Sequence, residues 1–293
     1  MFEHPQLAAL RAILETGSFD AAASAIGVTP SAISQRIKGL ERQVGGPVLR
    51  RGTPLVATTL GARLMAHAQD VALLGADLAR DLGAPTTLRL PIAVNADSLA
   101  TWFLPALAGH GDLRFDVKIV DQDHSAELLA SGEATAIVTT RADPIAGADC
   151  RPLGILRYIP TATPEFAATH FAEGLSYEAL SSAPALVFSD KDALQSDWAA
   201  ARAGRKVVLP AHRLPSTRGF VDAACLGMGW GLNPLPLVKD HLDTGRLVDL
   251  SPETPHDVTL YWQSSRLGAS VLEPLTKSVR SAARKALLPI DPA

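Results

Sequence analysis

The chain has 293 residues, of which 47% are hydrophobic and 19% charged, and its formal net charge is −3. This composition is that of a globular protein rather than a disordered one, and the length favours two or three domains. Because the whole molecule is slightly acidic, any affinity for nucleic acid must come from a local basic patch.

Targeting and cysteine patterns point to the cytoplasm. Cys150 and Cys225 are far apart and match neither a disulfide framework nor a zinc-binding spacing. Residues 1–17 lack the basic segment and apolar run of a signal peptide. No apolar stretch reaches about 18 residues, the length of a membrane span. We therefore expect a cytoplasmic protein with no membrane contact, no bound metal and no cofactor.

Residues 5–44 predict three helices. Apolar residues recur at helical spacing from Pro5 to Glu15, and Gly17 ends this first helix. Ser18 begins a second, alanine-rich helix, which a Gly-Val-Thr turn follows. Thr29 and Pro30 start the third helix, with a capping hydroxyl before a proline at the first helical position. Two helices joined by a short turn with glycine are typical of a helix-turn-helix.

The outer face of the third helix is polar and basic, as in a helix that enters a DNA major groove. Residues 18–52 hold five basic and two acidic side chains, a local excess of +3, and an Arg-Arg-Gly sequence lies where a wing could touch phosphates. We therefore predict a winged helix-turn-helix over residues 1–57 that binds double-stranded DNA. The alternative is a helical subdomain that only packs. The predicted DNA-binding residues are Ser18, Thr29, Pro30, Ser31, Ser34, Gln35, Lys38, Arg50 and Arg51.

Residues 58–85 predict one long helix with an apolar stripe. Thr58 or Thr59 caps its start, and a Gly-Ala-Pro sequence ends it. Too little chain lies beside this helix to bury the stripe within one small domain, so we expect two chains to pair through it. Burial against the chain's own C-terminal domain is the alternative. The predicted dimerisation residues are Leu60, Leu64, Val71, Leu74 and Leu78.

Residues 86–293 alternate between strand and helix patterns. The expected strands are 87–95, 115–121, 134–140, 185–189, 206–211, 246–250 and 258–263, with helices at 97–108 and 124–131. This predicts an α/β domain with largely parallel sheets. We expect two subdomains, the first over about 86–160 and 264–293 and the second over about 161–263, with crossovers near 158–163 and 260–265.

Ligands of such domains bind beyond the carboxyl ends of strands, at helix N-termini. The first such place is the stretch VNADSLATWFLP, where Ser98 and Thr101 could cradle a carboxylate. The alternative is that Asp97 or Ser98 is only a helix cap. Ser98 has no paired His and Asp, so we expect no catalytic residue and no enzyme.

The segment GSFDAAASAIGVTPSAISQRIKGLERQVGGPVLRR, followed by TTLGARLMAHA, resembles the winged helix-turn-helix and linker helix of LysR-type transcriptional regulators. The rest of the chain resembles the periplasmic-binding-protein-like effector domain of this family. The strings VNADSLATW, SDKDALQ and LYWQ are similar to the branch that senses lysine and arginine and controls basic amino-acid export. The resemblance implies a lysine- or arginine-responsive regulator of an exporter gene.

A basic amino acid requires an anion site at one end and carboxylates at the other. Asp121 and Asp192 fall at strand-to-helix junctions and could hold ammonium groups, although each could be a helix cap instead. Arg218 places an additional cation near the expected cleft. The predicted effector-binding residues are Asn95, Asp97, Ser98, Thr101, Trp102, Asp121, Thr139, Asp192 and Ser216.

The expected protein is thus a homodimeric or homotetrameric regulator whose partners are operator DNA, a basic amino acid and RNA polymerase. Two alternatives remain open at this point. One is a regulator of the same type that responds to a different small effector. The other is a solute-binding or enzymatic α/β protein whose N-terminal helices only dimerise.

Overall fold

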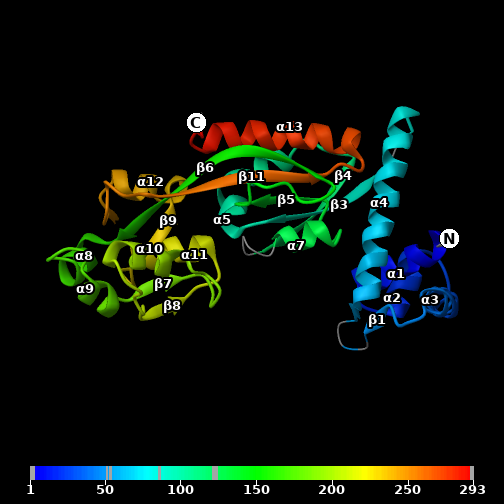
Figure 1. Ribbon diagram of the computed structural model, residues 1–293, viewed down its shortest axis with the longest axis horizontal. Coiled ribbons are helices and arrows are strands. Elements are labelled where there is room, and N and C mark those ends of the chain that lie inside the picture. Colours follow the sequence, from blue (N-terminus) through cyan, green and yellow to red (C-terminus); the bar gives the residue numbers. More distant parts are fainter. Residues whose placement is uncertain (1–3, 51, 53–54, 85–86, 121–124, 291–293) are drawn as a thin grey trace.

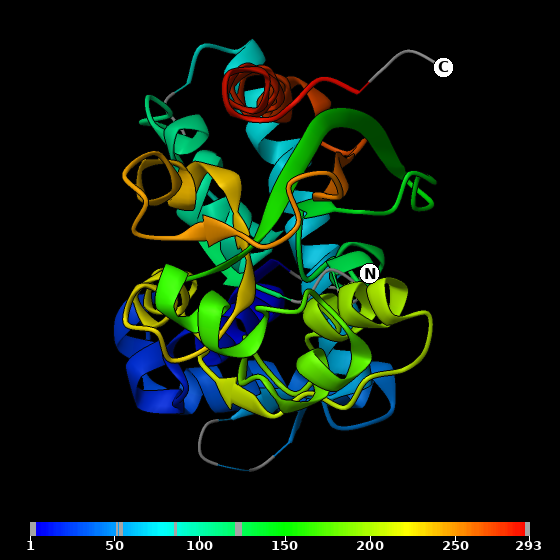
Figure 2. The same cartoon turned by 90° about the vertical axis from the view of Figure 1, so that its left-hand side faces the viewer.

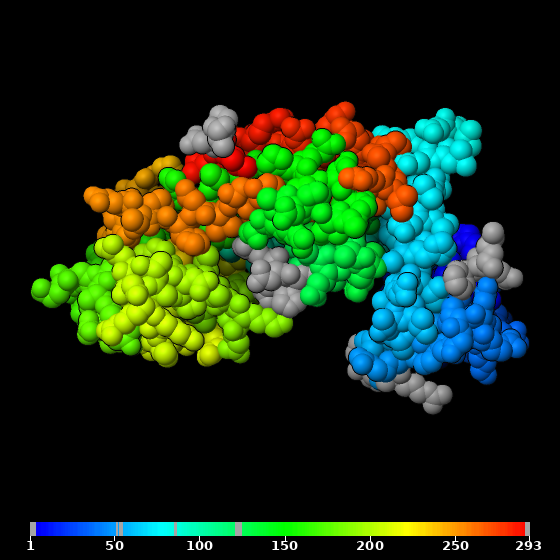
Figure 3. Space-filling view, viewed as in Figure 1, coloured from blue at the N-terminus to red at the C-terminus, as the bar shows by residue number. Residues whose placement is uncertain are grey.

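The structure is a computed structural model that describes residues 4–50, 52, 55–84, 87–120 and 125–290. It has three parts along the chain: a small N-terminal domain, one long upright helix and a larger α/β domain (Figure 1). In the space-filling view the N-terminal domain hangs from the long helix, beside the α/β domain (Figure 3). Within the described residues, no helix is both long and apolar enough to cross a membrane.

The N-terminal domain contains the three predicted helices, α1 (His4–Thr16), α2 (Phe19–Ala25) and α3 (Pro30–Val44). Short strands β1 (Leu49–Arg50) and β2 (Val56–Ala57) pair antiparallel after them as the base of a wing. The buried apolar faces of the three helices form one core of their own. This core explains the alanine-rich sequence of α2, because small side chains let α3 cross it closely.

The long helix α4 (Thr59–Asp81) begins at Thr58, whose side chain accepts a hydrogen bond from the Gly61 N–H at 3.1 Å. Its first turns pack on the N-terminal domain, and its later turns pack on the α/β domain through Leu73 and Ala76. The approach is close at Gly132, where a Cβ atom would lie 2.3 Å from the Ala66 Cβ.

The α/β domain is built on one seven-stranded mixed sheet, in the order β10-β6-β11-β5-β3-β4 with β9 added beside β6. The strands β3, β4 and β5 run parallel, as predicted, but β6 and β11 run antiparallel to their neighbours. The prediction of largely parallel sheets was therefore only partly correct for this domain. The strand bounds are β3 (Leu88–Val94), β4 (Leu113–Ile119), β5 (Ala136–Thr139), β6 (Ala148–Ala162), β9 (Gly231–Pro234), β10 (Val248–Asp249) and β11 (His256–Ser265).

Helical segments follow the first strands and cover the sheet. The segment after β3 consists of α5 (Ala96–Ser98), a π-helical turn over Leu99–Phe103 and α6 (Leu104–Leu107), and α7 (Ser125–Ala130) follows β4. The last helix, α13 (Ala269–Ala286), lies along the top of the sheet and is seen end-on in Figure 2.

The second subdomain hangs from the far end of β6 (Figure 1). A two-stranded parallel sheet of β7 (Ala185–Val187) and β8 (Ala211–Arg213) lies within it. The run 206–210 was expected to be a strand but lies outside one, because Pro210 has no N–H for a ladder and pairing starts after it. The helices here are α8 (Pro164–His170), α9 (Tyr177–Ser182), α10 (Leu194–Ala203), α11 (Thr217–Cys225) and α12 (Leu235–Asp243).

The second expected crossover falls in β11. Tyr261, Trp262 and Gln263 of this strand pair with β5, a strand of the first subdomain. The first expected crossover falls in β6, which pairs with β9 and β10 at its end, over Tyr158–Ala162. Both subdomains therefore share β6.

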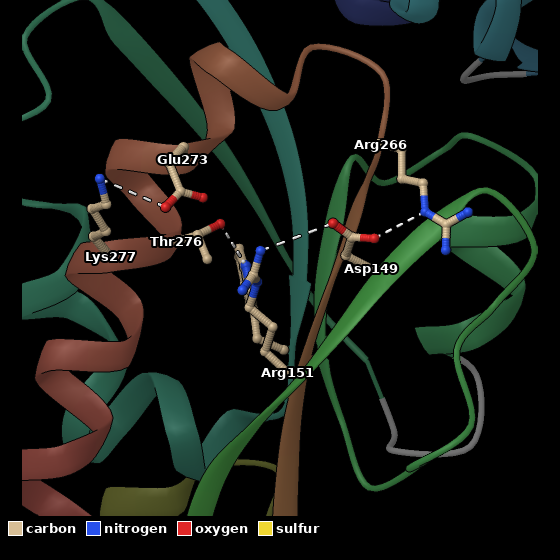
Figure 4. A network of polar contacts seen from close by, with 7 residues as sticks. Asp149, Arg151, Arg266, Glu273, Thr276 and Lys277 are labelled. Carbon is tan, nitrogen blue, oxygen red and sulfur yellow. Dashed lines mark hydrogen bonds and ion pairs between the residues drawn. The ribbon is translucent and has the colours of Figure 1, made fainter.

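Polar contacts join β6 to the residue that follows β11, and join β11 to α13 (Figure 4). Asp149 accepts a hydrogen bond from the Arg266 Nε at 2.9 Å and lies 3.9 Å from the Arg151 guanidinium. On the neighbouring helix, the buried Thr276 hydroxyl accepts a hydrogen bond from the Trp262 indole at 3.1 Å. These contacts fix the three elements around the core of the first subdomain.

Candidate DNA-binding surface and effector cavity

The third helix presents the predicted polar face to solvent. Ser31, Gln35 and Lys38 are exposed on it, and Ser34 is half-buried. Thr29 caps the helix by accepting a hydrogen bond from the Ala32 N–H at 3.2 Å, and Pro30 is its first residue. The helix therefore offers hydrogen-bonding and cationic side chains at the spacing that contacts base edges and phosphates.

The other predicted DNA-binding residues frame this helix. Ser18 caps α2 by accepting a hydrogen bond from the Ala21 N–H at 3.2 Å. Arg50 is exposed on β1 at the base of the wing. Arg51 lies outside the described residues. The paired strands and the exposed Arg50 are those of a wing that could lie beside a DNA backbone.

The apolar residues predicted to form one stripe on α4 are partly exposed and partly buried. Leu60, Val71, Leu74 and Leu78 are exposed, the last two by 52% and 60%, and we call these four residues the α4 stripe. Leu64 is instead 5% exposed and packs in the core of its own N-terminal domain. Its assignment to a dimer interface was therefore wrong, because the first turns of α4 bury that position on α1–α3.

A cavity of about 290 Å³ lies between the two subdomains. Such a volume suits a small metabolite. The segment after β3, the end of β4 and Tyr158 of β6 form one side of it, and elements of the second subdomain form the other. The polar residues of its wall are Asn95, Asp97, Tyr158, Lys191, Asp192, Gln195, Asp197, Thr217 and Asn233. Ile119, Phe188, Phe220 and Leu232 are among the apolar ones.

Asp97 has a partner for each carboxylate oxygen. The Tyr158 hydroxyl donates to its Oδ2 at 2.7 Å, and the Thr217 hydroxyl donates to its Oδ1 at 3.0 Å. Burial raises the pKa of Asp97 above the ordinary carboxyl value; the two hydrogen bonds lower it in part, and the charge of Asp192 raises it. Burial, followed by the charge of Asp97, holds the pKa of Tyr158 well above its usual value.

Carboxylates outnumber cations among the described residues of the wall. Asp97, Asp192 and Asp197 contribute three carboxylates, against the single cation of Lys191 among the described lining residues. Asp192 shapes its own turn, accepting hydrogen bonds from the Phe188 N–H at 2.9 Å and the Leu194 N–H at 3.0 Å. The cavity is therefore negatively charged.

Three amide atoms in the wall are buried and find no partner among the described residues. They are the Nδ2 of Asn95, the Oε1 of Gln195 and the Oδ1 of Asn233. An unpaired buried polar atom is costly, and a ligand that supplies its partner removes this cost. One unpaired donor and two unpaired acceptors thus belong to residues that line this negatively charged cavity.

The predicted effector-binding residues divide between this wall and other places. Asn95, Asp97 and Asp192 line the cavity. Asp121 lies outside the described residues. Ser98, Thr101, Trp102, Thr139 and Ser216 are absent from the described lining, and Arg218 is exposed outside it.

Ser98 and Thr101 are absent from the described lining because the helix after β3 begins at a different residue from the one we expected. Asn95, and not Asp97 or Ser98, is the cap, its side chain accepting a hydrogen bond from the Ser98 N–H at 3.0 Å. The helix begins at Ala96, so Ser98 and Trp102 turn into the subdomain and are buried. The Thr101 hydroxyl donates to the Asp97 carbonyl at 2.6 Å within the same helix. The expected carboxylate cradle of Ser98 and Thr101 is therefore not part of the described wall.

Two further residues that we predicted to bind the effector make local hydrogen bonds instead. The Thr139 hydroxyl is buried at the end of β5 and accepts a hydrogen bond from the Arg141 N–H at 3.2 Å. Ser216 caps α11, accepting from the Gly219 N–H at 3.2 Å, and its neighbour Thr217 faces the cavity. Tyr158, Gln195 and Thr217 were missed by sequence reasoning. Tyr158 could have been found from its place on a crossover strand. Thr217 could have been found from the Ser-Thr pair at the start of a helix.

These features define a class: a DNA-binding protein with an effector domain of two subdomains around a small polar cavity. Residues 4–62 match the model of the bacterial regulatory helix-turn-helix protein, lysR family, and residues 83–284 match that of the LysR substrate binding domain. The chain belongs to the LysR family of bacterial transcriptional regulators.

Individual relatives agree over nearly the whole length. The HTH-type transcriptional regulator LysG of Mycobacterium tuberculosis is 44% identical over 282 residues, which cover 95% of this chain and 93% of that relative. The crystal structure of ArgP from Mycobacterium tuberculosis matches with a TM-score of 0.84 and 43% identity, covering 98% of this chain and 99% of that one. Full-length LysG of Corynebacterium glutamicum with bound effector Arg matches with a TM-score of 0.69 and 34% identity, covering 98% and 100%.

Proposed function

We propose that this LysR-type regulator takes a basic amino acid, lysine or arginine, as its effector in the cavity between the subdomains. The observation that carries the proposal is the charge of the wall, in which three carboxylates face one lysine. A ligand with one net positive charge is the complement of such a site. The arginine bound to the related LysG supports the same class of ligand.

The polar atoms of the wall fit the two ends of such a molecule. Lys191 and the unpaired Nδ2 of Asn95 are suited to an α-carboxylate. The carboxylates, with the unpaired oxygens of Gln195 and Asn233, are suited to ammonium or guanidinium groups. The predicted residues Asn95, Asp97 and Asp192 thus belong to the proposed effector site.

We propose that the target gene encodes an exporter of basic amino acids, as the resemblance of the sequence implies. Pairing of two chains through the α4 stripe would present two recognition helices to an operator, and a tetramer would be a pair of such dimers. RNA polymerase is the further proposed partner. The two free cysteines suit the reducing cytoplasm.

A thermal-shift screen of the full chain against the twenty amino acids tests the effector class. A ligand that binds only the folded protein stabilises it by mass action, so lysine or arginine should raise the melting temperature selectively. If a neutral or acidic amino acid stabilised the protein instead, the assignment as a regulator would stand, but the proposal of a basic effector would be wrong. The variant Asp192→Asn should show a smaller shift with the basic ligand.

A further inference from the structure

Asp97 and its two hydrogen-bond partners come from three different parts of the effector domain. Asp97 itself lies on α5, directly after strand β3 of the first subdomain. Tyr158 lies on β6 where this strand passes into the second subdomain, and Thr217 is the first residue of α11 within that subdomain. A single carboxylate therefore hydrogen-bonds across the cleft, to the shared strand and to the opposite subdomain.

We propose that Asp97 is a latch that holds the two subdomains together across the cavity, and that Thr217 is the positioning residue that closes it. A charged acceptor makes each of the two hydrogen bonds stronger than a bond between neutral groups. Because the Thr217 bond joins the two subdomains, it exists only while the cleft is closed at α11. Opening the cleft would leave the Asp97 oxygen without this donor.

A bound cation would tighten the same latch. Asp97 shares the cavity with Asp192 and Asp197, so its negative charge stands among like charges with only Lys191 to offset them in the described wall. A cationic ligand between the subdomains relieves this repulsion and favours the closed arrangement, in which the carboxylates are nearest. This part rests on the proposed function; the hydrogen-bonded latch itself does not.

Hydrogen–deuterium exchange of the full chain tests the latch. The variant Thr217→Val removes the donor and keeps the size of the side chain. Without ligand, the amide hydrogens of α11 should exchange faster in this variant than in the wild type. With saturating arginine, the wild type should gain protection in α11, and the variant should gain little while binding arginine about tenfold more weakly.

Two further variants keep the test specific. Thr217→Ser retains the hydroxyl and should behave as the wild type, which a purely structural role of the threonine methyl group would not predict. Thr169→Val removes an exposed hydroxyl that donates to the Glu165 carbonyl at 2.9 Å within α8, and it should change neither measurement. Tyr158→Phe removes the other donor and should weaken arginine binding without the α11-specific change.

The outcomes separate the latch from the proposed effector. Equal exchange and equal arginine affinity in Thr217→Val and the wild type would overturn the latch. A wild type that binds neither arginine nor lysine would overturn the proposed function, while faster ligand-free exchange in Thr217→Val, restored in Thr217→Ser, would still support the hydrogen-bonded latch.

Discussion

Asp97 is the residue on which the chemistry of the cavity converges. Its two oxygens are already hydrogen-bonded, and burial raises the pKa of its carboxyl group. Each carboxylate oxygen can accept a second hydrogen bond, so a ligand cation can join without displacing Tyr158 or Thr217. The same residue can therefore organise the cavity and contribute to its affinity for a cation.

Acidification should weaken the binding of a basic effector. Because the pKa of Asp97 is raised in the folded protein, this group takes up its proton at a higher pH than an ordinary carboxyl group, and a neutral Asp97 attracts a cation less. The thermal shift caused by arginine should therefore shrink as the pH falls through this raised pKa. In the absence of ligand the sign is opposite, since the folded state binds this proton more readily than the unfolded state and gains stability from it.

The variant Asp97→Asn serves as the control for this pH dependence. It keeps the size of the side chain but cannot titrate, so its arginine-induced shift should be smaller and should vary less over the same pH range. A variant whose ligand shift falls with pH as steeply as that of the wild type would assign the titration to another group.

At the residue level the sequence located the site residues that follow strand ends better than those that reach the cavity through tertiary packing. Asn95, Asp97 and Asp192 lie next to strand ends, which the strand patterns reveal. Ser98 was misplaced because the side chain of Asn95 caps the helix, which therefore begins at Ala96 rather than at residue 97, a hydrogen-bonding choice that the residue types leave open. Tyr158 and Thr217 reach the cavity only through the tertiary arrangement of β6 and α11.

Helix α4 is the element that serves two domains at once. Its inner face is divided, with Leu64 in the N-terminal core and Leu73 in the core of the effector domain. Asp77 accepts hydrogen bonds from the Ser270 hydroxyl at 2.6 Å and the Val271 N–H at 3.0 Å, which caps the start of α13 from outside. The α4 stripe remains as an exposed apolar row on the outer face.

Charges in the α4 stripe and in the inner face should therefore have different effects. Leu74→Glu or Leu78→Glu should shift the full chain to smaller species in sedimentation, because a paired apolar seam cannot solvate the carboxylate. Leu64→Glu should instead lower the thermal stability of the N-terminal domain, since this side chain is buried within its own chain. An unchanged oligomer in both stripe variants would mean that chains assemble through another surface.

The recognition helix and the wing should contribute to DNA binding in different ways. Arg50→Ala should weaken operator and non-operator DNA alike and lower the slope of log affinity against log salt by about one unit, because a phosphate contact releases a counterion. Gln35→Ala should relax preference at one base-pair position. Footprinting and salt titration would show both, and wild-type behaviour in both variants would contradict the assignment of these surfaces.

Among the elements, strand β6 was the least visible in the sequence. Its 15 residues contain Pro152, Gly154 and Pro160, which interrupt any strand pattern. The fold accommodates them through a register shift against β11 and through Gly154, where a Cβ atom would lie 2.8 Å from the Leu288 carbonyl oxygen. The three N-terminal helices, whose caps and periodicity are local, were predicted from the sequence with bounds close to those of the structure.

In the whole molecule, strand β3 physically connects the cavity to the DNA-binding domain. At its start, the Arg89 guanidinium lies 3.3 Å from Glu15 of α1, and the Arg89 carbonyl accepts a hydrogen bond from Gln69 of α4 at 3.2 Å. At its end follow Asn95 and Asp97 of the cavity wall. Strand β3 therefore contacts α1 and α4 at one end and leads into the cavity wall at the other.

Calorimetric titration of the full chain with arginine, lysine, citrulline and norleucine tests the central claim most directly. Citrulline and norleucine keep the amino-acid head group of the basic ligands but lack the side-chain cation. A negatively charged cavity predicts that arginine or lysine binds roughly tenfold or more tightly than its neutral counterpart. Equal or tighter binding of citrulline or norleucine would contradict the account of this protein as a regulator that responds to basic amino acids.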